Sequence, residues 1–297
     1  MKIMKSQQSA SFILFLAFIA LLSESTGCSK SNDYPSPPGG SGANLVKLAN
    51  SSTLGQYLVD KNGVALYFFS NDYKGLNSCS GGCAGYWPYF YAGKLTQDIL
   101  GAGLKLADFD TIMVSGHIQT RYKSWPLYYY APAGNGVIEA SGKTTGEAVN
   151  GVWFVAKPDY TIMLANGQLV GNDGKNYTGT YVEGTGNTIY FTDAKGLTLY
   201  TFAVDSSNMN KFTKADFSNN SVWPIYDSIN VVVPSILDKT KFANISVAGH
   251  KQLTYNGWPL YHFSQDLNVQ GNNKGVSFPV PGKWPVAVKD INPAPHK

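Results

Sequence analysis

The feature that most constrains the fold is an internal duplication. The stretch "YLVDKNGVALYFFSND" at 57–72 matches "YFTDAKGLTLYTFAVD" at 190–205, and "VSGHIQTRYKSWPLYYY" at 114–130 matches "VAGHKQLTYNGWPLYHF" at 247–263. Both pairs are separated by the same 133 residues. Because self-similarity at a fixed offset is the signature of tandem structural units, the chain is expected to contain two homologous halves.

Each half is itself doubled. A Leu-Tyr-x-aromatic motif occurs four times, and a Trp lies 20 to 25 residues after the tyrosine of each copy. The tyrosines are Tyr67, Tyr128, Tyr200 and Tyr261, and the tryptophans are Trp87, Trp153, Trp223 and Trp284. The chain therefore predicts four quarter-units, each with a Leu-Tyr strand, a loop and a Trp strand.

Local patterns favour β-structure throughout. "YLVD-KNG-VALYFF" alternates on both sides of a turn in which Gly63 supplies a left-handed conformation, as expected of a β-hairpin. Only 14% of residues are charged, and no long stripe of helical period is present. We expect an all-β fold of two tandem homologous halves, each an antiparallel meander, built from four hairpin-plus-Trp-strand units. The alternative is a small propeller-like ring.

The N-terminal segment predicts export. Residues 1–27 combine two lysines with the apolar run "SFILFLAFIALL", as in a signal peptide, and end in Gly27-Cys28. The small residues before Cys28 resemble a bacterial lipobox, although Ser25 stands where Leu is usual. That resemblance implies that Cys28 is lipidated; an ordinary signal peptide, with Cys28 as a leftover thiol, is the alternative.

The rest of the chain divides by composition. Residues 28–44 are rich in Ser, Pro and Gly and are expected to form a flexible tether. The expected β repeat domains are 45–160 and 181–291, joined by a Gly/Asn-rich connecting segment at 161–180 that is compatible with a hairpin of its own. Residues 292–297 form a tail.

A known family shares these motifs. Tyr-x-[Phe/Trp/Tyr]-x-x-Asp, followed by a Cys pair and "CAGYWP", resembles the bacterial secreted-repeat lipoproteins with a Tyr-x4-Asp motif, over nearly all of 45–290. The matching residues are Tyr67, Phe69, Asp72, Tyr128, Tyr130, Tyr200, Phe202, Asp205, Tyr261, Phe263 and Asp266. Ala133 replaces the Asp of the second unit. The family has no established function, and its association with redox modules implies at most an envelope redox role.

The motif side chains have a structural interpretation. Aromatic residues two apart share one face of a strand and are expected to pack in the core, with the tyrosine hydroxyls at the rim; ligand stacking is the alternative. Each Asp is expected to start a turn by accepting backbone N–H groups. In the second unit, Pro132 and the following glycines are expected to replace that turn.

Cys79 and Cys83 are expected to form a structural disulfide, because exported proteins occupy oxidising compartments. A redox dithiol and a metal site are the alternatives, but a zinc site needs four ligands and no second Cys pair is present. His117 and His250 occupy equivalent positions and are weak candidates for metal ligands. Their recurrence follows from duplication alone. No cofactor is expected.

No catalytic motif appears, so an enzyme is not expected. The predicted function is that of a lipid-anchored protein of the bacterial envelope, in the outer membrane facing the periplasm or the surface. It would bind or scaffold an envelope protein or small ligand through an aromatic-rich, loop-lined face. The alternatives are an accessory role in envelope electron transfer or metal or haem handling, and a hydrolase using carboxylates. The net charge of +4 is spread without a basic run, so nucleic acid is not an expected partner.

Overall fold

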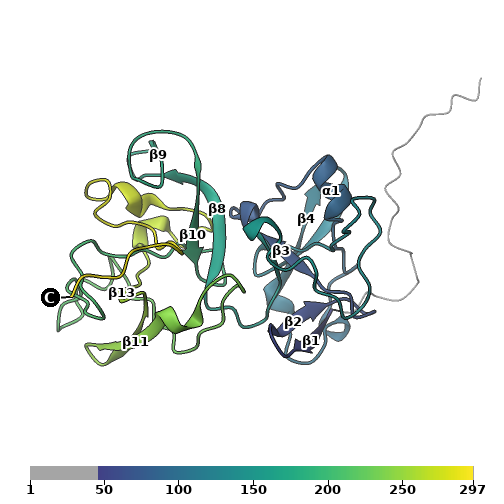
Figure 1. The fold of residues 1–297 in the computed structure, drawn as a ribbon, viewed down its shortest axis with the longest axis horizontal. Helices are drawn as coiled ribbons and strands as arrows, with labels where there is room; N and C mark the ends of the chain where they lie inside the picture. The colour runs from purple at the N-terminus through teal and green to yellow at the C-terminus, as the bar shows by residue number, and fades with distance from the viewer. Residues whose placement is uncertain (1–45, 297) are drawn as a thin grey trace, which may run out of the picture. The chain divides into compact units, whose positions relative to one another are not determined.

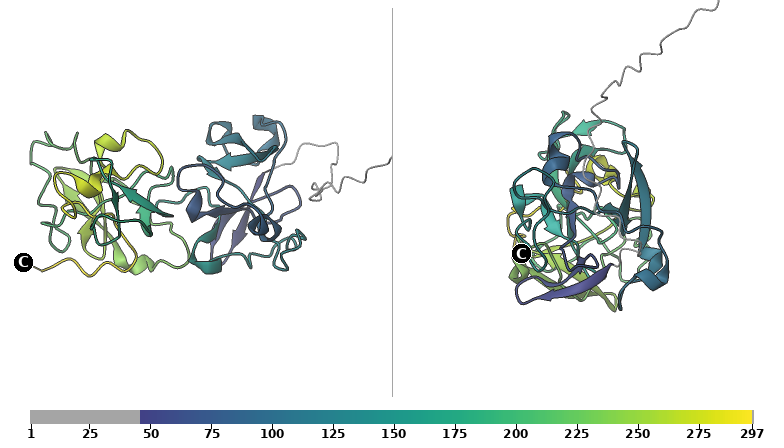
Figure 2. Two further views of the ribbon diagram at one scale, coloured as in Figure 1. Left: turned by 90° about the horizontal axis from the view of Figure 1, so that it is seen from above. Right: turned by 90° about the vertical axis from the view of Figure 1, so that its right-hand side faces the viewer.

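The computed structural model describes residues 46–296. The predicted signal peptide, Cys28 and the tether at 28–44 lie outside the described residues. The all-β prediction is confirmed, since the described chain consists of short strands and loops with one five-residue α-helix, α1 (Gly82–Tyr86), and seven 3-10 helices of three or four residues (Figure 1). Figure 2 shows the same short strands and long loops from two further directions.

The strands form small antiparallel sheets, and the members of each sheet are named in their spatial order. In the first half, which is residues 46–160, they are β1 (Lys47–Ser51) with β2 (Gly55–Val59); β3 (Tyr67–Phe69) with β7 (Trp153–Val155); and β4 (Phe109–Val114), β5 (His117–Tyr122) and β6 (Trp125–Pro126). In the second half, residues 161–296, they are β10 (Asn187–Thr192), β8 (Met163–Val170) and β9 (Asn176–Tyr177); and β11 (Phe242–Val247), β12 (His250–Tyr255) and β13 (Trp258–Pro259).

The two Leu-Tyr segments of the first half pair with each other. Tyr67 and Tyr128 exchange both backbone hydrogen bonds, each with an N···O distance of 2.9 Å. On the outer side of Tyr128 lies Tyr89 from the first Trp segment, and on the outer side of Tyr67 lies Val155 from the second. Each Leu-Tyr strand is therefore flanked by the Trp strand of the other quarter-unit.

The second half repeats this arrangement. Tyr200 and Tyr261 exchange backbone hydrogen bonds of 2.8 and 3.0 Å. Ile225, near Trp223, pairs with Tyr261, and Val286, near Trp284, pairs with Tyr200. Within residues 46–296 the quarter-units thus interlock two by two. The halves are the repeating units that the sequence predicted, and the propeller-like ring is not the arrangement found.

The predicted hairpin turns are also confirmed. Asp60 Oδ1 accepts the N–H groups of Asn62 and Val64, each at 2.9 Å, and Gly63 has a φ of 84°. Asp193 closes the equivalent turn by accepting the N–H groups of Lys195 at 2.8 Å and Leu197 at 3.0 Å. The short polar side chain and the left-handed glycine therefore have the roles that turn chemistry assigns to them.

The segment expected to connect the halves is itself a strand. β8 is the central strand of its sheet, pairing with β10 along Met163–Gln168 and with β9 at Leu169 and Val170. β2 and β10 are equivalent strands at the offset of 133 residues. Since β1 pairs with β2 and β8 pairs with β10, β8 has the position in the second half that β1 has in the first. The hairpin compatible with 161–180 is present, and the second half starts at β8 rather than at residue 181.

The interlocked pairing makes a fragment test possible. Residues 46–105 alone are expected to stay unfolded, because the strands that flank Tyr67 come from residues 125–156. Mixing this fragment with residues 106–162 should restore the near-ultraviolet circular dichroism of the packed tryptophans. A native-like near-ultraviolet signal from residues 46–105 alone would contradict the interlocked arrangement.

Candidate functional site

The family motif builds an aromatic stack in the centre of each half. In the first half, Trp87 and Trp153 lie face to face with ring centroids 3.8 Å apart and planes at 3°. Phe69 covers the outer face of Trp153 at 3.9 Å, and Tyr130 covers Trp87 at 4.5 Å. Both covering rings are the aromatic residue at the third position of the Tyr-x-aromatic motif. This position therefore completes a stack of four rings.

The second half contains the same stack. Trp223 and Trp284 lie 3.7 Å apart with planes at 8°. Phe202 stacks on Trp284 at 4.2 Å, and Phe263 stacks on Trp223 at 4.1 Å. The interlocking of the quarter-units explains which ring covers which tryptophan. Each covering ring is carried by a Leu-Tyr strand, and that strand lies next to the Trp strand of the other quarter-unit.

The motif tyrosines meet the tryptophans edge-on and donate to buried acids. Tyr128 Oη donates to Asp72 Oδ2 at 2.5 Å. Tyr261 donates to Asp205 at 2.8 Å and Tyr200 to Asp266 at 2.7 Å. In every case the acid belongs to the other quarter-unit of the same half. The Tyr and Asp of one motif are therefore not partners, which the sequence spacing alone did not reveal.

The second oxygen of each Asp closes a loop. Asp72 Oδ1 accepts from Ser78 N at 2.7 Å and from Ser78 Oγ at 2.6 Å. Asp205 and Asp266 accept the N–H groups of Lys211 and Lys274, each at 2.8 Å. The prediction that these acids accept backbone N–H groups is confirmed. The donors, however, lie six to eight residues downstream, so each Asp fastens a long loop rather than starting a tight turn.

The missing fourth acid is supplied from elsewhere. Tyr67 Oη donates to Glu139 Oε1 at 2.5 Å, and Glu139 Oε2 accepts from Thr145 N at 2.9 Å and Thr145 Oγ1 at 2.7 Å. Glu139 is only 7% exposed. The expectation that Pro132 and glycines replace the Asp is therefore wrong, because Glu139 makes the contacts that an Asp at position 133 would have made.

Two glycines allow the closing loops to reach the tyrosines. The N–H of Gly146 donates to Tyr67 Oη at 3.3 Å, and that of Gly275 donates to Tyr200 Oη at 3.2 Å. A Cβ at either glycine would lie within 2.9 Å of both the Tyr ring and a Trp ring. These positions require glycine because of the close approach of backbone to ring.

Burial changes the acidity of these groups. Desolvation raises the pKa of Asp72 to about 7, and that of Asp205 and Asp266 to about 6, although hydrogen bonds to each carboxylate act in the opposite direction. Burial also raises the pKa of the partner tyrosines. Neither group is therefore presented to solvent as a base or nucleophile.

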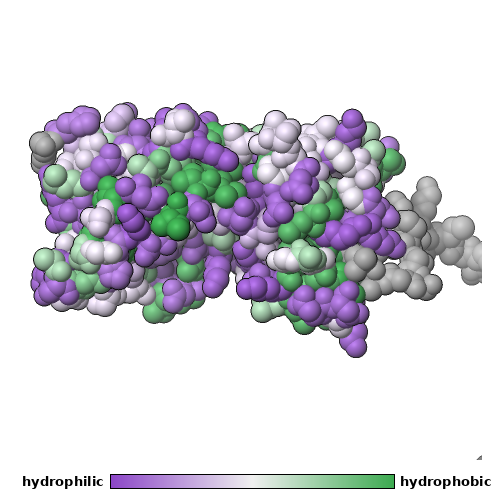
Figure 3. All heavy atoms as spheres, turned by 90° about the horizontal axis from the view of Figure 1, so that it is seen from below, coloured by the Kyte–Doolittle hydropathy of each residue, from purple (hydrophilic) through white to green (hydrophobic). Residues whose placement is uncertain are grey.

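The motif is thus part of the core. Tyr67, Tyr128, Tyr200 and Tyr261 are each 0% exposed. Core packing of these rings is confirmed, whereas the expectation that their hydroxyls reach the rim is wrong. On the face shown in Figure 3, apolar side chains form separate patches among polar ones.

The Cys pair forms the predicted disulfide between Cys79 and Cys83. Cys79 is buried and packs with Trp87 and Trp153 in one core cluster. At the equivalent position of the second half, Phe212 packs edge-on against Trp284 at 4.8 Å. The disulfide therefore fills the place of an aromatic ring beside the stack.

His117 and His250 lie at the first residue of β5 and β12, and both are exposed. His250 stacks on Phe217 with ring centroids 4.4 Å apart. Within residues 46–296, no group of three or more His, Cys, Asp or Glu side chains could hold a metal ion.

The strongest candidate for a binding site is a cleft of about 770 Å³. It is lined by Ala107, Asp108, Phe109, Asp110, Lys123 and Ser124 of the first half and by Lys195, Leu197, Asn268 and Gln270 of the second. None of the motif residues lines it. Gln270 Nε2 is buried and has no hydrogen-bond partner among the described residues, so it is an unsatisfied donor that does not face the open cleft. Sequence reasoning missed this cleft, because it is formed by hairpin turns that carry no motif.

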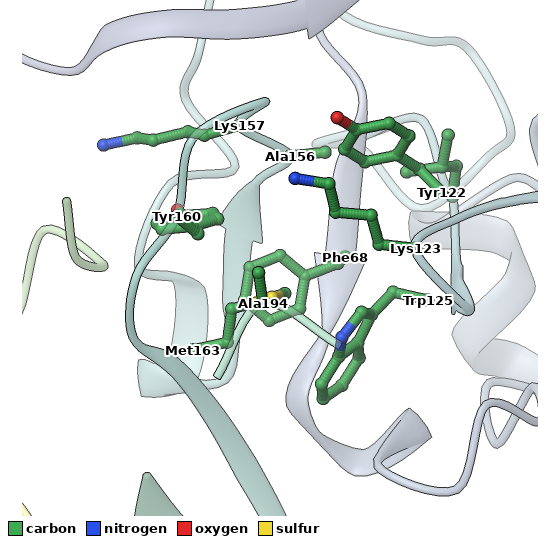
Figure 4. Close-up of a pocket in the computed structure, with 10 residues that line it drawn as sticks. Phe68, Tyr122, Lys123, Trp125, Ala156, Lys157, Tyr160, Met163 and Ala194 are labelled. Atoms are coloured by element: carbon green, nitrogen blue, oxygen red, sulfur yellow. The ribbon is translucent and has the colours of Figure 1, made fainter. Parts of the chain in front are cut away.

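Lys123 also lines a much smaller cavity (Figure 4). Its walls include Phe68, Tyr122, Trp125 and Met163. Trp125 is 1% exposed, and its Nε1 has no hydrogen-bond partner among the described residues. Lys157 also lines it, and Met163 and Ala194 contribute from the second half. Its volume of about 10 Å³ has room for about one water molecule, so it is too small to be a second ligand site.

Removing the substitute acid should destabilise the fold. Glu139→Ala leaves the buried Tyr67 hydroxyl and the Thr145 donors unpaired and is expected to lower the free energy of unfolding by about 1–3 kcal/mol. Glu139→Gln retains an acceptor for Tyr67 and should recover part of the loss. Urea denaturation of the three proteins measures this. Equal stability of Glu139→Ala and wild type would show that Tyr67 needs no acid.

The raised pKa values predict a pH dependence. An acid whose pKa is higher in the folded than in the unfolded protein binds its proton more tightly when folded, so stability falls as pH rises. For Asp72, Asp205 and Asp266 the window runs from about pH 4 to about pH 7. Thermal melts should show a lower melting temperature at pH 8 than at pH 5. Asp205→Asn should reduce that difference, and an unchanged difference in this variant would contradict the assignment.

Comparison with known protein families gives a match in both halves. A family model described as a secreted repeat of unknown function matches residues 49–90 and 245–288. Neither the curated proteins nor the solved structures contain a match. The matched segments include the first and the last Tyr motif, each with the Trp that follows it. The chain thus carries two segments of the secreted-repeat family, which confirms the resemblance drawn from its Tyr-x4-Asp motif.

Proposed function

We propose that this protein is a lipid-anchored, extracytoplasmic binding module of the bacterial envelope, without catalytic activity of its own. The description of the matching family as a secreted repeat supports an extracytoplasmic location. Cys28 would carry the lipid, and residues 28–44 would hold the folded halves away from the membrane. None of the helices between residues 46 and 296 has the length and apolar character that crossing a bilayer requires.

The observation that carries the binding role is the separation of the motif from the cleft. The residues common to the quarter-units are buried in the two stacks, where they stabilise the fold. The cleft is formed by turns at which the halves differ in sequence, and its volume is within the usual range for ligand sites. A shared architecture with a divergent, turn-lined cleft is how binding modules are commonly built, because loops carry function on a rigid scaffold.

The chemistry of the cleft also supports binding. Asp110 is already paired with Arg121, with an Nε···Oδ1 distance of 2.7 Å. Asp108 and Lys195 remain as charged groups that line the cleft and whose side chains make no hydrogen bond to the described residues. Their charges are suited to orienting a polar occupant.

Lipid anchoring can be tested directly. Expressed with its own N-terminus in a bacterium that processes lipoproteins, the protein should incorporate radiolabelled palmitate and fractionate with membranes. Cys28→Ala should abolish both, because the thiol is the attachment point. The double variant Cys79→Ala/Cys83→Ala is the matched control and should keep the label. Labelling that persists in Cys28→Ala would refute the anchor.

A further inference from the structure

The hairpin of β4 and β5 carries an apolar face from the core out to solvent. Phe109 and Tyr122 lie opposite each other at its base, where both are buried and their ring centroids are 4.7 Å apart. Met113 and Ile118 are opposite each other near the turn, and side chains two residues apart share one face of a strand, so this pair continues the same face. Met113 is 68% exposed and Ile118 is 41% exposed. The outer part of the apolar face is therefore open to solvent.

The tip of this hairpin is also free of acidic and basic side chains. Residues 111–120 contain no Asp, Glu, Lys or Arg. The charged residues that flank this stretch, Asp110 and Arg121, are paired with each other at an Nε···Oδ1 distance of 2.7 Å. Exposed apolar side chains that gather at one place mark a surface that contacts a protein, a ligand or a membrane.

The second half provides an internal reference, because its equivalent hairpin has the same turn and a polar tip. In both hairpins the two turn residues have positive φ values between 47° and 86°. The counterparts of Met113 and Ile118 are Ser246 and Lys251, which are also opposite each other and are both exposed. The hairpin therefore forms without an apolar pair at its tip, and the pair in the first half needs another explanation.

The backbone of the tip limits how deeply it can enter an apolar environment. β4 is the edge strand of its sheet. Lys123 N donates to Asp108 O, so by alternation the N–H and C=O groups of Thr111 and Met113 point away from β5. In the hydrocarbon of a bilayer these groups would be unsatisfied. The tip is suited to the headgroup region, where its apolar side chains reach the acyl chains while its backbone stays hydrated.

The length of the chain outside the described residues favours a membrane as the occupant. Residues 28–45 can span at most about 60 Å, at roughly 3.3–3.6 Å per residue. A domain of the size of the first half has a radius of gyration of about 13 Å and is therefore about 35 Å across. A lipid on Cys28 would thus keep every face of the first half within reach of the bilayer, and the uncharged apolar tip is the part that a bilayer would retain.

We propose that the tip of the β4–β5 hairpin, residues 111–118, inserts into the headgroup region of the bilayer that holds the lipid anchor. Met113 and Ile118 would contact the acyl chains, whereas the hairpin of the second half would stay in water. The contact orients the anchored protein rather than anchoring it, because two apolar side chains bury much less area than an acyl chain does. This inference rests on the lipid anchor proposed above and specifies the surface that meets the membrane.

The test holds the mature full-length chain on vesicles by a hexahistidine tag in place of Cys28, with a nickel-chelating lipid in place of the acyl chain. Met113→Cys then carries the environment-sensitive fluorophore NBD, since Cys79 and Cys83 are joined in the disulfide and do not react. On vesicles of phosphatidylethanolamine and phosphatidylglycerol, the NBD emission should shift to the blue and become protected from iodide quenching. Ser246→Cys with the same label is the matched control and should show neither change.

A second variant checks the role of the apolar pair. Ile118→Asp in the chain labelled at position 113 should abolish the blue shift, because a carboxylate would then have to leave water beside the label. Melting curves would confirm that this substitution at an exposed position leaves the protein folded. Identical NBD spectra at positions 113 and 246 would overturn the proposal, as would a blue shift that Ile118→Asp leaves unchanged.

The same label distinguishes a membrane from a second copy of the chain. A blue shift that appears without vesicles and grows with protein concentration would overturn the proposal and assign the tip to self-association. Because the tag replaces the lipid in this experiment, its outcome does not depend on palmitate labelling of Cys28. The orientation can therefore fail without the anchor failing.

Discussion

The stacked pair of tryptophans at the centre of each half determines how the rest of the chain is arranged. Two indoles in face-to-face contact bury a large area and need a ring above and below to complete the packing. The covering rings come from strands that belong to the other quarter-unit. A quarter-unit alone would expose one indole face and lack its neighbouring strands, so the half is the smallest unit in which the aromatic surface is fully covered.

The buried acids add specificity to this packing. Removing a carboxylate from water is unfavourable, which is why burial raises the pKa of Asp72 to about 7. Each acid compensates for this by joining a tyrosine hydroxyl of one quarter-unit to a loop of the other. An arrangement with the wrong partner would leave both groups unsatisfied, so the Tyr–acid contacts favour the interlocked pairing over alternatives in which each unit closes on itself.

The sequence predicted the parts that depend on local patterns. The hairpins at Asp60 and Asp193, the all-β class, the two halves and the Cys79–Cys83 disulfide each follow from spacing or turn chemistry. The exchange of Trp strands did not, because Tyr67 can pair with either Trp87 or Trp153 without any change in local pattern. Glu139 was missed for a related reason. Three copies place the acid five residues after the tyrosine, but contact with Tyr67 requires only that a loop bring a carboxylate to the hydroxyl, and a longer side chain in a longer loop does this equally well.

Duplication gives the structure an internal reference, and the informative positions are those at which the copies differ. Where they agree, as in the stacks, the residues are explained by packing. At the turn that follows β5 and β12, the backbone is the same but the surroundings are not. In the second half Asn256 Nδ2 donates to Ile291 O at 2.8 Å, and residues 291–296 cover the turn. In the first half Lys123 Nζ donates to Pro158 O at 2.7 Å, and the chain then enters β8. The two halves therefore fasten the segment that follows the Trp strand to the same turn with different side chains, because the chain has to continue into a second half in one case and not in the other.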